Sequence, residues 1–173
     1  NLSEELYEEV IIRFRSLYPE ASFISGVTAV GASPENFVAS SYHPHLDIAQ
    51  NYQPSEVMIM TSRALNALGS EKRRDAYFQI AENIIAPAMV HALEPAFVPW
   101  ATPFDPWLLY QLAGHEKFVG GKISTLDEPH FLYWAAMCRD LGLNFVPHSG
   151  DDFGIASAVK MGLPLLIGAG VSA

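Results

Sequence analysis

The clearest pattern in the chain is the alternation of helical and continuous apolar stretches over its C-terminal third. Residues 127–141 and 153–161 have helical character, and each is followed by a glycine that can close a helix, Gly142 and Gly162. Short buried strands that alternate with helices are typical of a parallel sheet with crossover helices. The pattern predicts an α/β fold with a mixed or mostly parallel sheet and flanking helices. Apolar runs with the length of such strands lie at 117–124, 143–147 and 163–167.

The first hundred residues are more helical and less regular. Residues 3–18 predict an amphipathic helix, with Ser3 as its N-cap and acidic residues in its first turns. Residues 22–43 predict two strands joined by a turn over 31–36. Further helices are expected from about 54 to Gly69 and from Ser70 onward, with a kink or a new helix start at Pro87.

Prolines and aromatic residues are interleaved over residues 94–107. The prolines, together with Trp100, Phe104 and Trp107, predict an irregular segment that packs on the core or lines a pocket. Tyr, Trp and Phe are favoured at the centres of interfaces. The segment 97–110 is therefore also a candidate contact surface for a protein partner or for a second copy of the chain.

Length and composition predict one folded domain. The chain has 173 residues, of which 50% are hydrophobic and 17% charged, and this is enough apolar material for a core. It contains no apolar run of the roughly 20 residues that a membrane span needs. The sequence begins with Asn1 rather than Met, has no signal-peptide pattern, and ends abruptly a few residues after an apolar strand. We expect a single α/β domain over residues 1–173 that is processed or cut from a longer chain.

A formal net charge of −9, from 19 acidic and 10 basic residues, narrows the choice of partners. Nucleic-acid binding depends on Lys and Arg, and an acidic surface also disfavours anionic lipids. We therefore expect a small-molecule substrate rather than nucleic acid or a membrane. The basic run 72–74 is flanked by acids and predicts a solvated helix face. The single cysteine, Cys138, lies in an apolar helical run and predicts a buried thiol, which is consistent with a cytoplasmic protein.

The run His43-Pro44-His45-Leu46-Asp47 follows a predicted strand. Side chains two residues apart on a strand point the same way, so His43, His45 and Asp47 are candidate ligands for a divalent transition metal such as Zn, Mn or Fe. The run resembles the H-x-H-x-D sequence of several metallohydrolase families. It departs from metallo-β-lactamases at Ile48, lacks the acid that precedes the pair in TatD-like hydrolases, and belongs to a chain too short for a whole barrel. The alternative is a pair of surface or capping histidines beside a proline turn.

A second polar run, His148-Ser149-Gly150-Asp151-Asp152-Phe153-Gly154, lies between a predicted strand and a helix, where open α/β sheets bind ligands. Its glycines let the backbone approach a ligand, and its paired acids suit a metal, an amine or a ribose hydroxyl. With Gly162-Leu163-Pro164 it is loosely similar to the donor-binding half of GT-B glycosyltransferases, which implies a nucleotide-sugar site. The alternative is that one of the acids only caps the helix. The candidate catalytic residues are His148 and Asp151, and the candidate ligand-binding residues are Ser149, Gly150, Asp152 and Gly154.

The last residues form an apolar strand followed by Gly168-Ala169-Gly170-Val171-Ser172. This run resembles the first turn of a sirtuin or of another dinucleotide-binding domain, although the sequence stops before the helix that such a turn would open.

These candidates support three hypotheses. The first is a metal-assisted hydrolase or lyase that acts on a small polar substrate, with a metal at 43–47 and His148 or Asp151 as general base. The second is a nucleotide-binding or nucleotide-sugar-binding, transferase-like domain with its site at 149–154. The third is a non-catalytic interaction or assembly domain that uses the segment 97–110.

Overall fold

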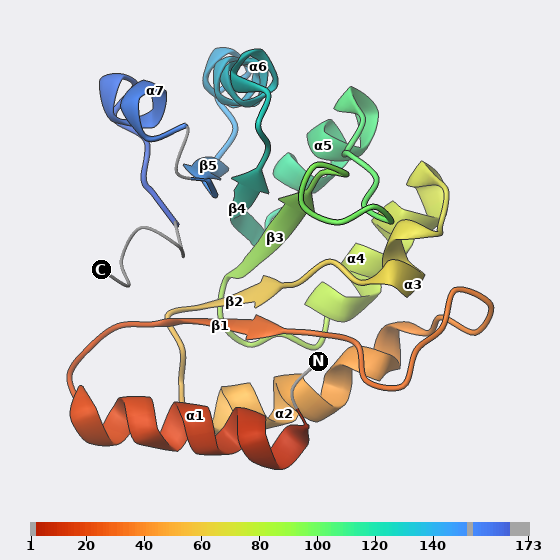
Figure 1. Cartoon of the computed structure of the whole chain (residues 1–173), viewed down its shortest axis with the longest axis vertical. Helices are drawn as coiled ribbons and strands as arrows, with labels where there is room; N and C mark the ends of the chain where they lie inside the picture. The colour runs from red at the N-terminus through yellow and green to blue at the C-terminus, as the bar shows by residue number, and fades with distance from the viewer. Residues whose placement is uncertain (1–2, 152–153, 167–173) are drawn as a thin grey trace. The chain divides into compact units, whose positions relative to one another are not determined.

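The computed structural model describes residues 3–151 and 154–166, and its helices and strands alternate along the chain (Figure 1). The chain divides into two compact units, residues 1–88 and 89–173. Neighbouring strands β1 and β2 pair in parallel, as do β4 and β5. In sheet order the strands are β1 (Ile24–Val27), β2 (Glu56–Ile59), β3 (Ala88–Leu93), β4 (Phe118–Ser124) and β5 (Val146–Ser149).

In the first unit, amphipathic helices pack beside two short parallel strands. Ser3 caps the first helix, because its hydroxyl oxygen accepts a hydrogen bond of 3.3 Å from the backbone N–H of Leu6. That helix buries Tyr7 and Ile11, one turn apart on a single face. The elements of this unit besides β1 and β2 are α1 (Glu4–Leu17), η1 (Ala39–Tyr42), α2 (His43–Asn51), α3 (Arg63–Asn66) and α4 (Ser70–Ala81).

The second unit contains the strands that carry the candidate site. Its helices are α5 (Pro106–Ala113), α6 (Glu128–Asp140) and α7 (Ile155–Lys160). Asp105 and Asp127 cap α5 and α6 by accepting backbone N–H groups at 2.9 and 3.2 Å, and a proline occupies the first turn of each helix. In the β4–β5 pair, Ile123 lies opposite Ser149. Leu165 adds a single parallel bridge to Ser149 on the other side of β5.

The prediction of an α/β fold with a mostly parallel sheet and flanking helices is confirmed. Gly142 and Gly162 have φ values of +61° and +68°, as expected for glycines that end helices. Cys138 is buried, and its burial raises the pKa of the thiol to about 11, so it is a packing residue. That residues 1–173 form a single domain stays a prediction.

Three local predictions in the first ninety residues are wrong. The second predicted strand, up to residue 43, is the short helix η1 followed by the start of α2, because Pro44 suits the first turn of a helix. Residues 56–59 form β2 rather than a helix, with buried Val57 and Ile59 alternating with less buried neighbours. The apolar run after Pro87 is strand β3, whose first five residues are all buried.

The aromatic segment packs on the second unit through Phe104, whose ring centroid lies 5.7 Å from that of Trp134. Trp100 and Trp107 keep 38% and 39% of their surface exposed. Its role as a contact surface stays a prediction. None of the helices in the described ranges has the length and apolar character that crossing a bilayer requires.

Candidate functional site

The predicted metal ligands His43, His45 and Asp47 lie on α2, not on a strand. Successive helical residues turn by about 100°, so residues two apart point in nearly opposite directions. His45 is only 1% exposed and stacks on Tyr7, with ring centroids 4.4 Å apart. Within residues 3–151 and 154–166 no group of three His, Cys, Asp or Glu side chains is placed to hold a metal ion. The structure therefore does not assemble the predicted ligand set.

The run from His148 to Gly154 lies at the carboxyl end of β5, as the sequence predicts. Asp151 is buried, and its Oδ1 accepts a hydrogen bond of 2.8 Å from the backbone N–H of Gly154. The N-cap residue of α7 is Gly154, which has no side-chain cap hydrogen bond, and Asp151 bonds the backbone N–H of that residue. The catalytic role of Asp151 and the helix-capping alternative both stay predictions. Asp152 and Phe153, like the Gly-Ala-Gly-Val-Ser run at 168–172, lie outside the described residues.

His148 lies on β5, next to β4. Its Nδ1–H donates a hydrogen bond of 2.9 Å to the carbonyl oxygen of Val146. Its register partner on β4 is Lys122. The binding roles predicted for Ser149, Gly150 and Gly154 are not tested by these contacts.

Lys122 on β4 is a residue that motif searching misses. Side chains two apart on a strand share a face, so Lys122 and Ser124 point to the same side of β4. Lys122 is partly buried, and this burial lowers the pKa of its ammonium group below the ordinary value. The sequence contains one clue to it, a lysine inside the otherwise apolar, glycine-rich run Phe118-Val119-Gly120-Gly121-Lys122-Ile123.

His91 on β3 completes this cluster. Its Nε2 lies 3.1 Å from the hydroxyl oxygen of Ser124, and its side chain is only 6% exposed. Burial, and after it the nearby charge of Lys122, lowers the pKa of His91 from 6.5 to about 4. The imidazole is therefore neutral at physiological pH.

Gly150 allows the cluster to pack against the turn after β5. A Cβ atom at this position would lie 2.6 Å from Ser124 Oγ and 2.8 Å from both Lys122 Cγ and the carbonyl oxygen of Ile123. The backbone N–H of Gly150 donates a 2.8 Å hydrogen bond to that carbonyl oxygen. Glycine is thus required for steric reasons, and the glycine-containing run lies beside the side chains of Lys122 and Ser124.

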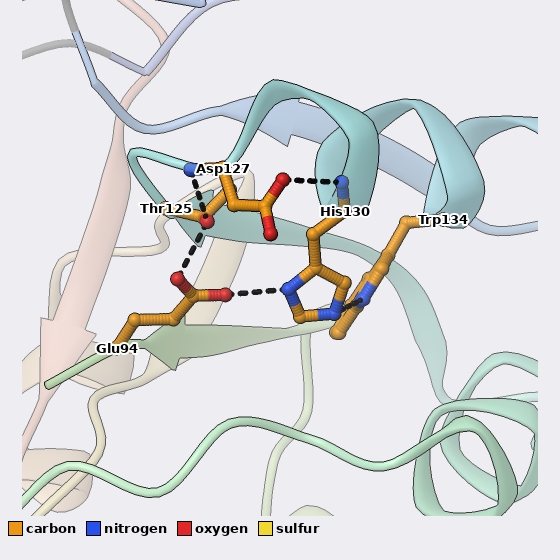
Figure 2. A network of polar contacts seen from close by, with 5 residues as sticks. All are labelled: Glu94, Thr125, Asp127, His130 and Trp134. Carbon is orange, nitrogen blue, oxygen red and sulfur yellow. Dashed lines mark hydrogen bonds and ion pairs between the residues drawn. The ribbon is translucent and has the colours of Figure 1, made fainter.

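A second polar network joins the carboxyl ends of β3 and β4 to α6 (Figure 2). The Glu94 carboxylate accepts a 2.6 Å hydrogen bond from the Thr125 hydroxyl and lies 2.5 Å from Nδ1 of His130. The indole N–H of Trp134 donates to Nε2 of His130 at 2.9 Å. Because Nε2 is an acceptor, Nδ1 carries the proton and donates to Glu94. The network holds the two strand ends in place and leaves the imidazole without a free ring nitrogen.

No protein-family model and no curated protein sequence matches the chain. Several solved structures, however, are similar to the chain. The chain is similar to a dihydrodipicolinate synthase from Acinetobacter baumannii complexed with pyruvate, with a TM-score of 0.78, 20% identity and coverage of 98% of this chain and 54% of that one. It is also similar to YagE from E. coli K12, a protein of the dihydrodipicolinic acid synthase family in complex with pyruvate, with a TM-score of 0.78, 12% identity and coverage of 96% and 53%.

A third similar structure is the dihydrodipicolinate synthase of Thermotoga maritima, with a TM-score of 0.74, 17% identity and coverage of 97% of this chain and 54% of that one. The likeness establishes the fold. The chain spans about half the length of the structures it matches. Parallel strands that follow chain order are the arrangement of a β/α barrel, in which active sites lie at the carboxyl ends of the strands. Lys122, Ser124 and His91 lie near such ends.

These findings overturn the hypothesis of a metal-assisted hydrolase. The similar structures are dihydrodipicolinate synthases rather than metallohydrolases, and the H-x-H-x-D run lies on a helix. The similar structures support neither the hydrolase nor the metal-binding interpretation of this chain, and a bound divalent metal stays an untested prediction. The similar structures reported above are not nucleotide-sugar transferases either. The error came from reading a five-residue run as extended backbone.

Proposed function

We propose that this chain carries the reactive lysine of a Schiff-base lyase, which makes or breaks a carbon–carbon bond beside the keto group of an α-keto acid such as pyruvate. One observation carries the proposal: Lys122 is partly buried on β4 next to the neutral His91. Among the described residues Lys122 forms no ion pair. A lysine in such surroundings is biased toward the neutral, nucleophilic amine.

The chemistry that this amine can perform belongs to its deprotonated form, which burial favours by lowering the pKa of Lys122. The nitrogen of Lys122 adds to the keto carbon, the former carbonyl oxygen leaves as water, and a carbon–nitrogen double bond remains. Protonated, that bond withdraws electrons from the neighbouring carbon. The carbon can then lose a proton and attack an aldehyde, or be released when a carbon–carbon bond breaks. Lysine supplies this electron sink without a metal or a bound cofactor.

The similar structures support the choice of substrate class. Two of them, YagE and the Acinetobacter baumannii synthase, are complexes with pyruvate. Pyruvate is an α-keto acid, the class that a nucleophilic lysine can activate.

Reductive trapping tests the proposal. The full-length protein is incubated with pyruvate and sodium borohydride, which reduces a Schiff base to a stable amine, and the adduct is located by peptide mass spectrometry. We expect one pyruvate-dependent adduct, on Lys122. Lys160→Ala is the matched control, because Lys160 is an exposed lysine of the same unit. It should trap pyruvate like the wild type, whereas Lys122→Ala and Lys122→Arg should not.

Two results would overturn the proposal. One is the absence of any pyruvate-dependent adduct in the folded wild-type protein. The other is an adduct that persists in a folded Lys122→Ala variant, which would assign the reaction to another amine.

A further inference from the structure

We infer that Ser124 is a catalytic proton carrier in Schiff-base formation at Lys122 and that His91 is the residue that positions its hydroxyl. The inference rests on the function proposed above and adds two residues to it. Ser124 is 3% exposed, and its hydroxyl lies between the β3 imidazole and the turn after β5.

The first support is placement. Ser124 and Lys122 lie on one face of β4, two residues apart. Both side chains pack against Gly150 in the turn after β5, because a Cβ added at this glycine would lie 2.6 Å from Ser124 Oγ and 2.8 Å from Lys122 Cγ. The serine hydroxyl and the stem of the lysine therefore lie beside the same glycine.

The second support is the direction of the hydrogen bond to His91. Its Nδ1 is buried and has no hydrogen-bond partner among the described residues. A buried N–H without an acceptor is rarer in proteins than an unused acceptor, so the proton is best placed on Nε2. His91 then donates to Ser124 Oγ at 3.1 Å. This contact fixes the serine oxygen and leaves the serine's own proton to point elsewhere.

The third support is that this proton has no strong acceptor among the described residues. The contact from Ser124 Oγ to the carbonyl oxygen of Gly150 is 3.5 Å, longer than an ordinary hydroxyl hydrogen bond. A buried hydroxyl with a weakly used proton, next to a partly buried lysine, is suited to donate to an atom bound on that lysine.

The proton steps balance within the pair. After the amine has added to the keto group, the carbon bears a hydroxyl and a nitrogen that still carries a proton. Ser124 gives its proton to the hydroxyl, which leaves as water while the nitrogen lone pair forms the double bond. Ser124 then takes up the proton that the nitrogen loses. The serine ends unchanged, and the sum is amine plus ketone giving imine plus water.

His91 acts through Ser124 rather than as a base. With a pKa of about 4, the imidazole is a poor proton acceptor near neutral pH. As a neutral donor, it stabilises the negative charge that builds on Ser124 Oγ while the proton leaves.

Timed borohydride quenching of the full-length protein with pyruvate tests the inference, since it gives the rate of Schiff-base formation apart from pyruvate affinity. Ser124→Ala should slow formation on the order of a hundredfold, the usual contribution of a general acid. His91→Leu should slow it about tenfold, the loss of one hydrogen bond to the reacting group. His91→Gln, whose amide can donate from a similar position, should recover most of the rate.

A double variant separates positioning from mere packing. His91→Leu combined with Ser124→Ala should be no slower than Ser124→Ala alone, because His91 acts through the serine. The matched control is Ser157→Ala on α7, whose hydroxyl bonds Glu128 away from Lys122 and which should react at the wild-type rate.

The outcomes distinguish this inference from the proposed function. No trapping by the wild type refutes both. Wild-type trapping on Lys122 with an unchanged rate in Ser124→Ala refutes the inference alone. If His91→Leu does not fold, Ser124→Ala and His91→Gln test the inference. A wild-type rate of Schiff-base formation in Ser124→Ala overturns it. A rate in His91→Gln that is as low as in Ser124→Ala also overturns it.

Discussion

Replacing His91 with glutamine should flatten the dependence of stability on pH between 6.5 and 4. The native environment disfavours the charged imidazole, mainly through burial and secondarily through Lys122. The unfolded chain has no such restriction and binds a proton at an ordinary histidine pKa. The stability that His91 contributes is therefore complete above pH 6.5 and is lost as the pH falls toward 4.

The magnitude follows from the two pKa values. A pKa lowered from 6.5 to about 4 corresponds to about 3 kcal/mol of stability, because each pKa unit is worth about 1.4 kcal/mol. This value needs little reduction for solvent screening, since the side chain is only 6% exposed. It is a large part of the 5–15 kcal/mol that is typical for a domain.

Urea denaturation of the full-length protein at several pH values between 7.5 and 4 measures the effect. Titration of the many carboxylates lowers the stability of both proteins, so the informative quantity is the difference between wild type and His91→Gln. Glutamine changes the stability by an amount that does not vary with pH. We expect the wild type to lose about 3 kcal/mol more than the variant over this range, and parallel curves would refute the reasoning.

Three further substitutions test contacts of the second unit by urea denaturation. Gly150→Ala should destabilise the protein by about 1–3 kcal/mol, because the new Cβ would overlap a backbone and a hydroxyl oxygen. In the control Gly69→Ala the new Cβ meets nothing within 4 Å, and stability should change by less than about 0.5 kcal/mol. Equal effects of the two substitutions would contradict the steric argument. Thr125→Val should cost about 1–3 kcal/mol, because a buried hydroxyl that serves both Glu94 and the backbone N–H of Asp127 is lost, and a neutral effect would show that the network is dispensable. Asp151→Ala should cost about 1 kcal/mol through loss of the bond from Gly154 N–H, and no change in stability would show that this bond does not stabilise the turn.

Local sequence chemistry predicted the parts of the fold that depend on nearby residues. Ser3 caps its helix as expected, since a capping side chain needs only a backbone N–H three residues away, and Asp127 caps α6 in the same way. Gly142 and Gly162 adopt the positive φ that a helix end favours. The alternation of helices and apolar runs predicted the parallel sheet, because this alternation is also visible among residues close together in the sequence.

The errors arose where strand and helix compete over short windows. Residues 56–59 are followed closely by helix α3, and hydrogen bonds to distant segments, among them the pairing with β1, make them a strand. The run from His43 to Asp47 contains residue types that suit a metal in either conformation, but Pro44 and the burial of His45 place it on a helix. Strand pairing and core packing involve residues about thirty positions apart, which a local pattern does not contain.

The sequence did not predict the candidate site because its residues, too, are far apart along the chain. Lys122 is unremarkable by type, and what distinguishes it is a partly buried environment built from β3 and the turn after β5. Each strand contributes one or two residues near its carboxyl end: His91, then Lys122 and Ser124, then Gly150. Because neighbouring parallel strands are joined through helices, these residues are about thirty positions apart and form no contiguous motif. The sequence does hold half of the information, since a lysine in an apolar strand and a glycine after the next strand are both visible in it. The carboxyl ends of successive strands, when aligned with one another, bring these two residues together, whereas known short motifs do not contain them.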